Sequence, residues 1–183
     1  MIVQTFFDNK VKLIHQKKFK DKRGFFSEIF NYKELNKIGI HDTFVQDNFS
    51  FSSNKGVIRG LHYQCPPKHQ SKLVRVINGK ILDVVVDIRK NSKTYGKHKS
   101  FIISRKNWRQ LYISAGFAHG FCTLEDNTDI EYKVSNYYSK KNERTLKWDD
   151  LYLGINWRIN KTNVIISPKD KKAINFIKLN SPF

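Results

Sequence analysis

Short stretches of apolar residues, some alternating with polar residues and some unbroken, recur along the whole chain. Val, Ile, Phe and Tyr dominate them, and this composition is typical of β-strands. Turn-forming pairs such as Asn78-Gly79 and Tyr95-Gly96 separate several of the stretches. The pattern predicts strands at 11–14, 73–77, 81–88, 100–104, 110–113, 130–135 and 163–166.

Patterns typical of helices are few. The sequence favours one short helix at 33–37, after Asn31, and a terminal turn or helix at 169–177. It contains no long amphipathic helix, internal repeat or Gly/Ser-rich linker. We therefore expect a single all-β domain over residues 1–183, an antiparallel sandwich or barrel with a few short helices.

Composition supports a folded domain and adds a strong positive charge. Of the 183 residues, 39% are hydrophobic and 14% aromatic, which is enough for a substantial core. The chain has 34 Lys and Arg against 16 Asp and Glu, a formal net charge of +18, which suits nucleic acid, an anionic membrane or a phosphorylated small molecule. The lysines are scattered, however, without a basic helix, zinc-finger spacing or aromatic sheet motif. We expect a solvated basic surface and neither nucleic acid nor membrane as partner.

The cysteines and the N-terminus indicate a compartment. Cys65 and Cys122 are the only cysteines, and their spacing suggests neither a disulfide framework nor a zinc site. The first ten residues turn polar too early for a signal peptide, and no stretch has the length of a transmembrane helix. We expect reduced thiols in a cytoplasmic protein.

The segment 56–72 combines a histidine with two cations. His62 lies between Arg59 and Lys72, where a strand-like run is interrupted by glycine and then by Pro66-Pro67. A histidine titrates near neutral pH and can take a proton from carbon, while the cations can hold a phosphate or a developing oxyanion. The combination suggests proton abstraction from an anionic substrate.

A second histidine, His119, follows in the segment 116–121. We expect both histidines on turns that flank strands, from which they could converge in a barrel. The second segment resembles the Pro-x-Gly-x-x-His motif of the cupin superfamily, although Ser114 replaces the proline. Metal-binding cupins carry a His-x-His pair and a nearby glutamate, but Gln64 takes the second histidine's place and no acid follows. Two histidines alone make a poor metal site, so we expect no metal.

Several motifs in order extend the resemblance to one family. The runs are 21–28, 45–48, 56–72, 83–89, 116–121, 132–133 and 167–170. Together they resemble the dTDP-4-dehydrorhamnose 3,5-epimerases, from about Phe19 to Asp170. The resemblance implies a cupin-type jelly roll that binds a dTDP-linked 4-keto-6-deoxyhexose and exchanges protons at the two carbons beside the ketone, without cofactor. It also implies a homodimer in the dTDP-L-rhamnose pathway, which supplies carbohydrate such as lipopolysaccharide O-antigen.

The resemblance assigns catalytic roles to four residues. It implies that His62 is the base, that Asp170 orients and stabilises its imidazole, and that Tyr132 is the acid on the opposite face. Lys72 would stabilise the enolate oxygen. By base rate alone, Tyr132 would be a packing residue and Lys72 a surface cation.

The resemblance also implies a set of substrate contacts. His119 would donate a hydrogen bond to the sugar, Tyr138 would stack on thymine, and cations would hold the diphosphate. The N-terminal residues of the set would serve the site of the neighbouring subunit. Glu143 falls in the segment 140–144, whose composition is that of an ordinary exposed turn. The full substrate set is Arg23, Phe26, Glu28, Gln46, Asn48, Arg59, His119, Tyr138, Glu143 and Lys169.

Other functions remain open at this stage. A relative that epimerises only one carbon, or that acts on another nucleotide sugar such as a GDP-ketoheptose, would carry the same catalytic residues. A cupin that binds a nucleotide sugar or nucleic acid without catalysis is a second class, and a sugar ketoisomerase is a third.

Overall fold

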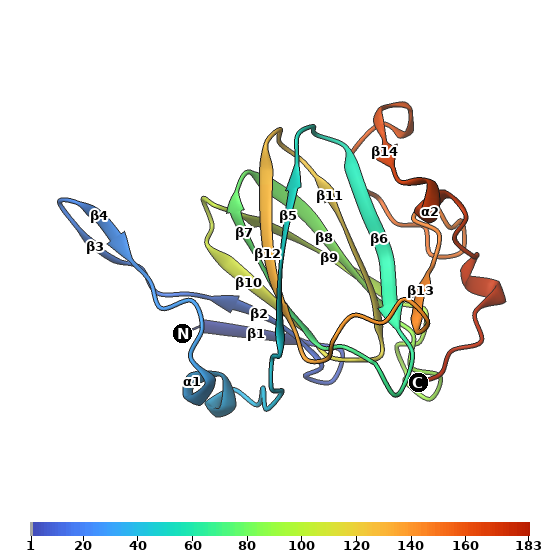
Figure 1. Cartoon of the computed structure of the whole chain (residues 1–183), viewed down its shortest axis with the longest axis horizontal. Helices are drawn as coiled ribbons and strands as arrows, with labels where there is room; N and C mark the ends of the chain where they lie inside the picture. The colour runs from blue at the N-terminus through green and yellow to red at the C-terminus, as the bar shows by residue number, and fades with distance from the viewer. Residues whose placement is uncertain (1) are drawn as a thin grey trace.

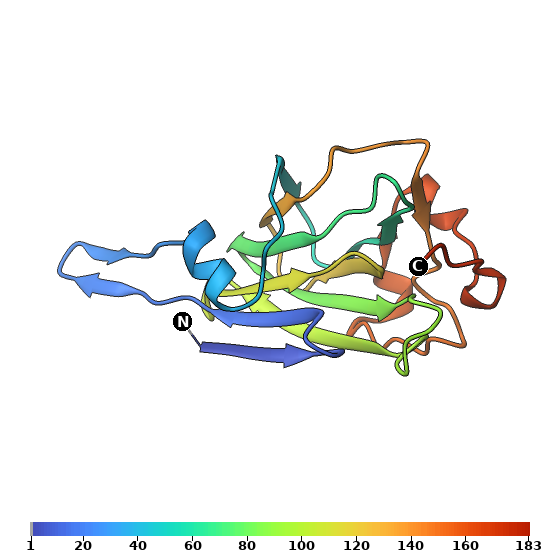
Figure 2. The same cartoon turned by 90° about the horizontal axis from the view of Figure 1, so that it is seen from below.

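Two β-sheets face each other in the computed structural model, which describes residues 2–183 (Figures 1 and 2). Neighbouring strands of the first sheet run antiparallel. In spatial order its strands are β1 (Ile2–Phe6), β2 (Val11–His15), β10 (Arg109–Ile113), β7 (Lys72–Asn78), β12 (Thr128–Val134) and β5 (Gln46–Ser52). This order leaves β5 at one edge, paired only with β12.

The second sheet is built from strands of the middle and the C-terminal part of the chain. Its order is β13 (Glu143–Thr145), β6 (Val57–Gln64), β11 (Phe117–Thr123), β8 (Lys80–Asp87) and β9 (His98–Ser104), with β14 (Ile165–Ile166) parallel to β6. The remaining elements are the hairpin β3 (Phe19–Asp21) and β4 (Gly24–Phe26), the helices α1 (Tyr32–Lys37) and α2 (Pro168–Lys171), and the 3-10 turns η1 (Lys161–Asn163) and η2 (Phe176–Lys178). The prediction of an all-β fold with a few short helices is therefore confirmed.

Apolar side chains from both sheets fill the space between them. Val74 and Ile130 from the first sheet and Val85 and Phe117 from the second are almost completely buried in one cluster. Burial of each such side chain contributes about 1.5–3 kcal/mol. This cluster occupies only part of the interior, and the remainder holds the polar side chains described below.

The outer face of each sheet is also covered. Helix α1 packs Leu35 on the first sheet beside Ile14, and Asn31 caps this helix by accepting the Glu34 N–H. The C-terminal segment packs Trp157 and Phe176 on the second sheet. Because both faces of the second sheet are buried, β8 reads as a nearly continuous apolar run.

Most of the predicted elements are found, but one strand and one helix near the C-terminus differ from the prediction. The predicted strand 163–166 is a 3-10 turn followed by the two-residue β14. The predicted terminal turn or helix at 169–177 is divided into α2 and η2. Between them Ile174 forms a parallel bridge with Leu146, so pairing with the sheet interrupts the helix.

The sequence suggested that the two histidines lie on turns. In the structure both lie inside strands. His62 is in β6 and His119 in β11, and the two residues face each other in the register of the pair. Glycines explain the difference, since a Cβ on Gly60 would lie 2.5 Å from the Cα of Gly120. The strands approach closely at this point, and the glycines continue the sheet instead of ending it.

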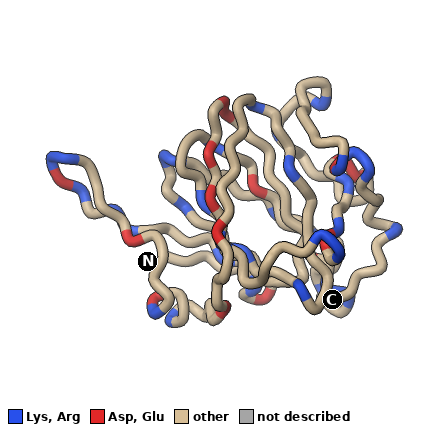
Figure 3. The backbone as a smooth tube through the Cα atoms, viewed as in Figure 1, with Lys and Arg blue, Asp and Glu red and all other residues tan. Residues whose placement is uncertain are grey.

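The hairpin β3–β4 extends away from the two sheets (Figures 1 and 2). Its Phe19, Phe25 and Phe26 side chains are 50%, 47% and 68% exposed. Lys and Arg are distributed over the hairpin, both sheets and the C-terminal segment and do not gather on one element (Figure 3). Within residues 2–183, no helix is long and apolar enough to cross a membrane.

Candidate active site

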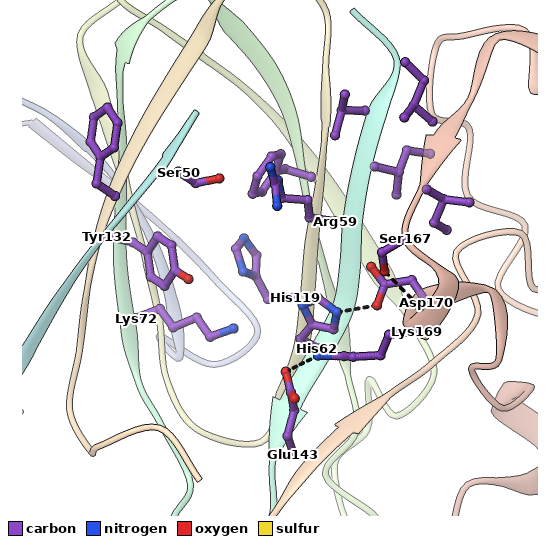
Figure 4. A pocket seen from close by; sticks show the side chains of 16 residues that line it. Ser50, Arg59, His62, Lys72, His119, Tyr132, Glu143, Ser167, Lys169 and Asp170 are labelled. Atoms are coloured by element: carbon purple, nitrogen blue, oxygen red, sulfur yellow. Dashed lines mark hydrogen bonds and ion pairs between the residues drawn. The ribbon is translucent and has the colours of Figure 1, made fainter. Parts of the chain in front are cut away.

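A pocket of about 570 Å³ opens between β5 and β6 and contains the predicted catalytic residues (Figure 4). His62, Lys72, Tyr132 and Asp170 all line it. A smaller adjoining pocket of about 280 Å³ shares three of these side chains. Four residues that are distant in the sequence therefore meet because β6, β7, β12 and α2 surround one cavity.

His62 forms a short hydrogen bond to a buried carboxylate. Its Nε2 lies 2.7 Å from Oδ1 of Asp170, whose side chain is only 3% exposed. The other carboxylate oxygen accepts the Gly60 N–H at 3.4 Å, and Ser167 accepts the N–H of Asp170 at 3.1 Å. Burial alone would raise the pKa of Asp170, but the hydrogen bonds from His62 and the backbone outweigh it and lower that pKa. An ionised Asp170 therefore orients the imidazole and leaves Nδ1 as its free nitrogen.

Tyr132 lies across the cavity from this pair. It comes from an inward-facing position of β12, and Figure 4 shows its hydroxyl pointing into the pocket on the side opposite His62. Burial raises the pKa of Tyr132, and the nearby cation of Arg59 only partly opposes the shift. The phenol is therefore protonated at neutral pH, so it holds a proton that can be transferred to a carbanion.

Lys72 and His119 form the inner part of the pocket. Burial lowers the pKa of Lys72 to about 8, against the attraction of Asp83 and Glu143. His119 Nε2 lies 3.0 Å from both carboxylate oxygens of Asp83, which is completely buried. The inner wall thus combines one lysine, one aspartate and one imidazole.

A second group of polar side chains lines the outer part. Glu143 accepts hydrogen bonds from Lys169 at 2.6 Å and Tyr138 at 3.0 Å, while Arg59 donates to the Phe51 carbonyl at 3.0 Å. Burial would raise the pKa of Glu143, but Lys169 and Tyr138 lower it. The exposed-turn interpretation of Glu143 is wrong, because the residue begins β13 and its side chain is 15% exposed.

Gln46 and Asn48 occupy inward positions on β5, beside the smaller pocket. The Gln46 amide donates to Asn48 at 2.8 Å, and its oxygen accepts the Tyr138 N–H at 3.0 Å. These contacts connect the edge strand to the segment that carries Tyr138. The polar residues expected in the same chain's pocket are therefore brought together.

Three residues of the predicted set line neither of the two pockets. Arg23 is on the hairpin, with 91% of its side chain exposed, and pairs with Asp21 at 2.6 Å. Phe26 is exposed at the end of β4, and Glu28 accepts a hydrogen bond from Asn31 at 2.9 Å. Arg23 and Phe26 lie on the hairpin that extends away from its own sheets, and Glu28 follows it in the chain.

Sequence reasoning gave no role to Ser50 and Ser167 in the pocket lining or to Asp83, which lies behind His119. Asp83 lies in β8, where a charge within an apolar run was the available signal. Ser50 and Ser167 line the cavity, but serines carry no comparable signal. Within the described part of the chain, no group of three His, Cys, Asp or Glu side chains could hold a metal ion.

Known proteins share this fold. The dTDP-4-dehydrorhamnose 3,5-epimerase of Bacillus anthracis, solved with TDP and pyrophosphate bound, is 43% identical, with a TM-score of 0.92 over 95% of this chain and 98% of that one. A 3,5-epimerase of Legionella pneumophila, solved with dTDP-4-keto-L-rhamnose, is 42% identical, with a TM-score of 0.92 over 98% and 94% of the two chains. Fold and pocket place the chain among the cupin-like nucleotide-sugar epimerases.

Sequence comparison makes the assignment specific. The family model described as dTDP-4-dehydrorhamnose 3,5-epimerase matches residues 9–178. The enzyme of that name from Sinorhizobium fredii is 46% identical over 179 residues, which are 98% of this chain and 91% of that protein. The chain belongs to the dTDP-4-dehydrorhamnose 3,5-epimerase family, and the resemblance noted from its motifs is confirmed.

Proposed function

We propose that the chain converts dTDP-4-dehydro-6-deoxy-D-glucose into dTDP-4-dehydro-L-rhamnose by inverting carbons 3 and 5 of the hexose. The observation that carries this proposal is the placement of His62, with Asp170, across the cavity from Tyr132. Inversion at a carbon requires a base on one face and an acid on the other. The family membership of the chain supports the choice of substrate.

Each inversion consists of two proton transfers. His62 takes the proton from the carbon beside the ketone, and the electron pair of the broken C–H bond moves into the enolate. The Lys72 ammonium stabilises the charge on the enolate oxygen. Tyr132 then gives its phenolic proton to the opposite face of the same carbon. Exchange with water restores both side chains, and no cofactor or metal takes part.

The outer part of the pocket suits the nucleotide. Arg59 and Lys169 provide cations for the diphosphate, and Tyr138 provides an aromatic face for thymine. Gln46, Asn48 and Glu143 then provide further polar contacts, and His119 contacts the sugar.

We also propose that two copies of the chain form a homodimer. Arg23, Phe26 and Glu28 then serve the neighbouring site, because they lie on or beside a hairpin that extends away from its own pocket. Residues 1–183 act as one domain in each copy. The cytoplasm is the proposed compartment, in keeping with Cys65 and Cys122, which form no disulfide.

The decisive experiment follows proton exchange in deuterated water. The purified protein is incubated with dTDP-4-dehydro-6-deoxy-D-glucose, and proton NMR records the signals at carbons 3 and 5. We expect both signals to disappear, and the product to be accepted by a reductase that forms dTDP-rhamnose. Exchange at one carbon indicates a restricted epimerase, and no exchange indicates another nucleotide sugar or a binding protein.

The His62→Asn variant tests the base. We expect a loss of about 10²–10⁴-fold in the exchange rate, the usual contribution of a general base, with dTDP binding retained. His41→Asn is the matched control, because His41 is exposed near α1 and, among residues 2–183, its side chain forms a hydrogen bond with Asn36 alone. An exchange rate of about a tenth of the wild-type value or more in His62→Asn removes this residue from the role of base.

A further inference from the structure

The buried pair of Asp83 and His119 has no part in the proton transfers proposed above. Asp83 is an inward position of β8, and among residues 2–183 the side chain of His119 is the only one that forms a hydrogen bond with its carboxylate. His119 lines the pocket from β11, with only 8% of its side chain exposed. The pair is therefore built into the wall of the sugar site.

The hydrogen bond defines which ring nitrogen carries hydrogen. A carboxylate accepts hydrogen bonds and donates none. Since Nε2 of His119 lies 3.0 Å from both oxygens of Asp83, Nε2 is the protonated nitrogen. In a neutral imidazole, Nδ1 then has a free lone pair. No hydrogen bond to Nδ1 is made within the described residues.

The surroundings favour the neutral ring. Burial lowers the pKa of His119, and the attraction of Asp83 opposes this only in part, while the charges of Lys72 and His62 lower it further. Asp83 also lies near Lys72, so its single negative charge already has one cation beside it. A second positive charge in this wall is therefore disfavoured.

We propose that Asp83 fixes His119 in the tautomer whose Nδ1 accepts a hydrogen bond, and that this acceptor binds a ring hydroxyl of the hexose. The inference rests on the proposed function for the identity of the sugar. It reverses the expectation that His119 donates. Asp83 is a positioning residue, and His119 determines specificity by contact with the substrate.

In this arrangement His119 and Lys72 bind different kinds of oxygen atom in the sugar. A ketone oxygen has no hydrogen to donate, so an acceptor nitrogen does not bind it. The Lys72 ammonium, which only donates, binds the ketone but gains less from a hydroxyl. The two side chains together orient the ring so that the ketone faces Lys72 and a hydroxyl faces His119.

The first test is independent of activity. Protein labelled with ¹⁵N in its histidines is examined by NMR at pH 7, and the signals of His119 are assigned by comparison with His119→Phe. We expect an unprotonated Nδ1 and a protonated Nε2. A protonated Nδ1 overturns the inference, and this result does not depend on whether the protein turns over any sugar.

A positioning variant tests the role of Asp83. In Asp83→Asn the amide can donate or accept, so we expect the two tautomers of His119 to mix and kcat/KM to fall by about tenfold to a hundredfold. Asp150→Asn is the control, because Asp150 is also buried but its carboxylate accepts N–H groups of Leu153 and Phe176 outside the pocket. An unchanged tautomer in Asp83→Asn contradicts the positioning role.

A cycle of protein and substrate variants tests the contact. Wild type and His119→Phe are each given the natural sugar and its 2-deoxy and 3-deoxy analogues, and exchange at carbon 5 is measured. We expect one analogue to lose about tenfold or more in kcat/KM with wild type and far less with His119→Phe. Equal losses in both proteins for both analogues overturn the contact. If the proposed function fails, no exchange occurs even with the natural sugar, and the NMR result still stands.

Discussion

Lys72 places its ammonium group in a buried part of the pocket, where Asp83 and Glu143 attract it. Burial lowers its pKa from the ordinary value of 10.5 to about 8. The charge that stabilises the enolate is therefore lost at a pH close to neutrality. We expect kcat/KM for proton exchange to decrease as the pH rises through about 8.

Protein stability should change in the opposite direction. Because the pKa of Lys72 is lower in the folded chain than in the unfolded chain, the unfolded chain binds more protons between about 8 and 10.5. The contribution of this group to stability therefore increases with pH in that interval, and the loss of rate is not caused by unfolding. In Lys72→Arg, provided that activity remains, the decrease should move to higher pH, since arginine stays charged. An unchanged profile assigns the decrease to another group.

The residues whose roles could be predicted lie in recognisable sequence motifs. His62 and Tyr132 were identified by motifs, and their side chains meet in the pocket as expected. Asp83 was present in a recognised motif but received no role, because its function depends on a partner 36 positions away. Ser167 accepts a backbone N–H of its own turn. A serine in a loop does not indicate this role in the sequence.

Helix α2 is a single turn that carries two site residues. Ser167 caps it by accepting the N–H of Asp170 at 3.1 Å, and the turn also holds Lys169. Because a helix this short is not stable alone, the cap contributes a large part of its local stabilisation. We expect Ser167→Ala to reduce the free energy of unfolding by about 1 kcal/mol and to slow proton exchange, because Asp170 and Lys169 lose their fixed positions.

Asn160→Ala provides a matched control. Asn160 caps η1 by accepting the Thr162 N–H at 3.2 Å, and this turn does not line the pocket. Urea unfolding should show losses of the same order in both variants, while only Ser167→Ala slows exchange. Equal exchange rates in the two variants would mean that the cap of α2 serves stability alone.

Elements with a strong apolar pattern were predictable, and elements that depend on distant partners were not. The nearly continuous apolar run at β8 and the alternation at β12 gave correct strands. At β6 and β11 the glycines suggested turns, but the close approach of Gly60 and Gly120 gives these glycines a place inside the sheet. The segment after α2 was ambiguous because the bridge to Leu146 determines its structure.

The hairpin β3–β4 bears on whether the active sites of a dimer depend on residues from both copies. If Arg23 serves the neighbouring site, His62→Asn and Arg23→Ala are defective for different reasons in different subunits. A mixed dimer then contains one site with an intact His62 and an intact Arg23 from the partner copy. We expect a mixture of the two variants, after subunit exchange, to be more active than either variant alone.

Light scattering on the separate variants should first show that both are dimeric. The control mixture combines His62→Asn with Tyr132→Phe. Both of these residues line the pocket of one chain, so every site in their mixed dimers remains defective. Absence of rescue in the Arg23 mixture, with subunit exchange demonstrated, shows that each chain completes its own site.

The edge position of β5 has a consequence for the adaptability of the pocket. β5 pairs only with β12, whereas β6 pairs with β11, β13 and β14. Displacing β5 therefore breaks one ladder of hydrogen bonds, and displacing β6 breaks three. Gln46, Asn48 and Ser50 lie on the compliant wall and His62 on the rigid one. Evolution can thus alter which nucleotide or sugar is accepted by remodelling β5, while the geometry of proton abstraction is preserved.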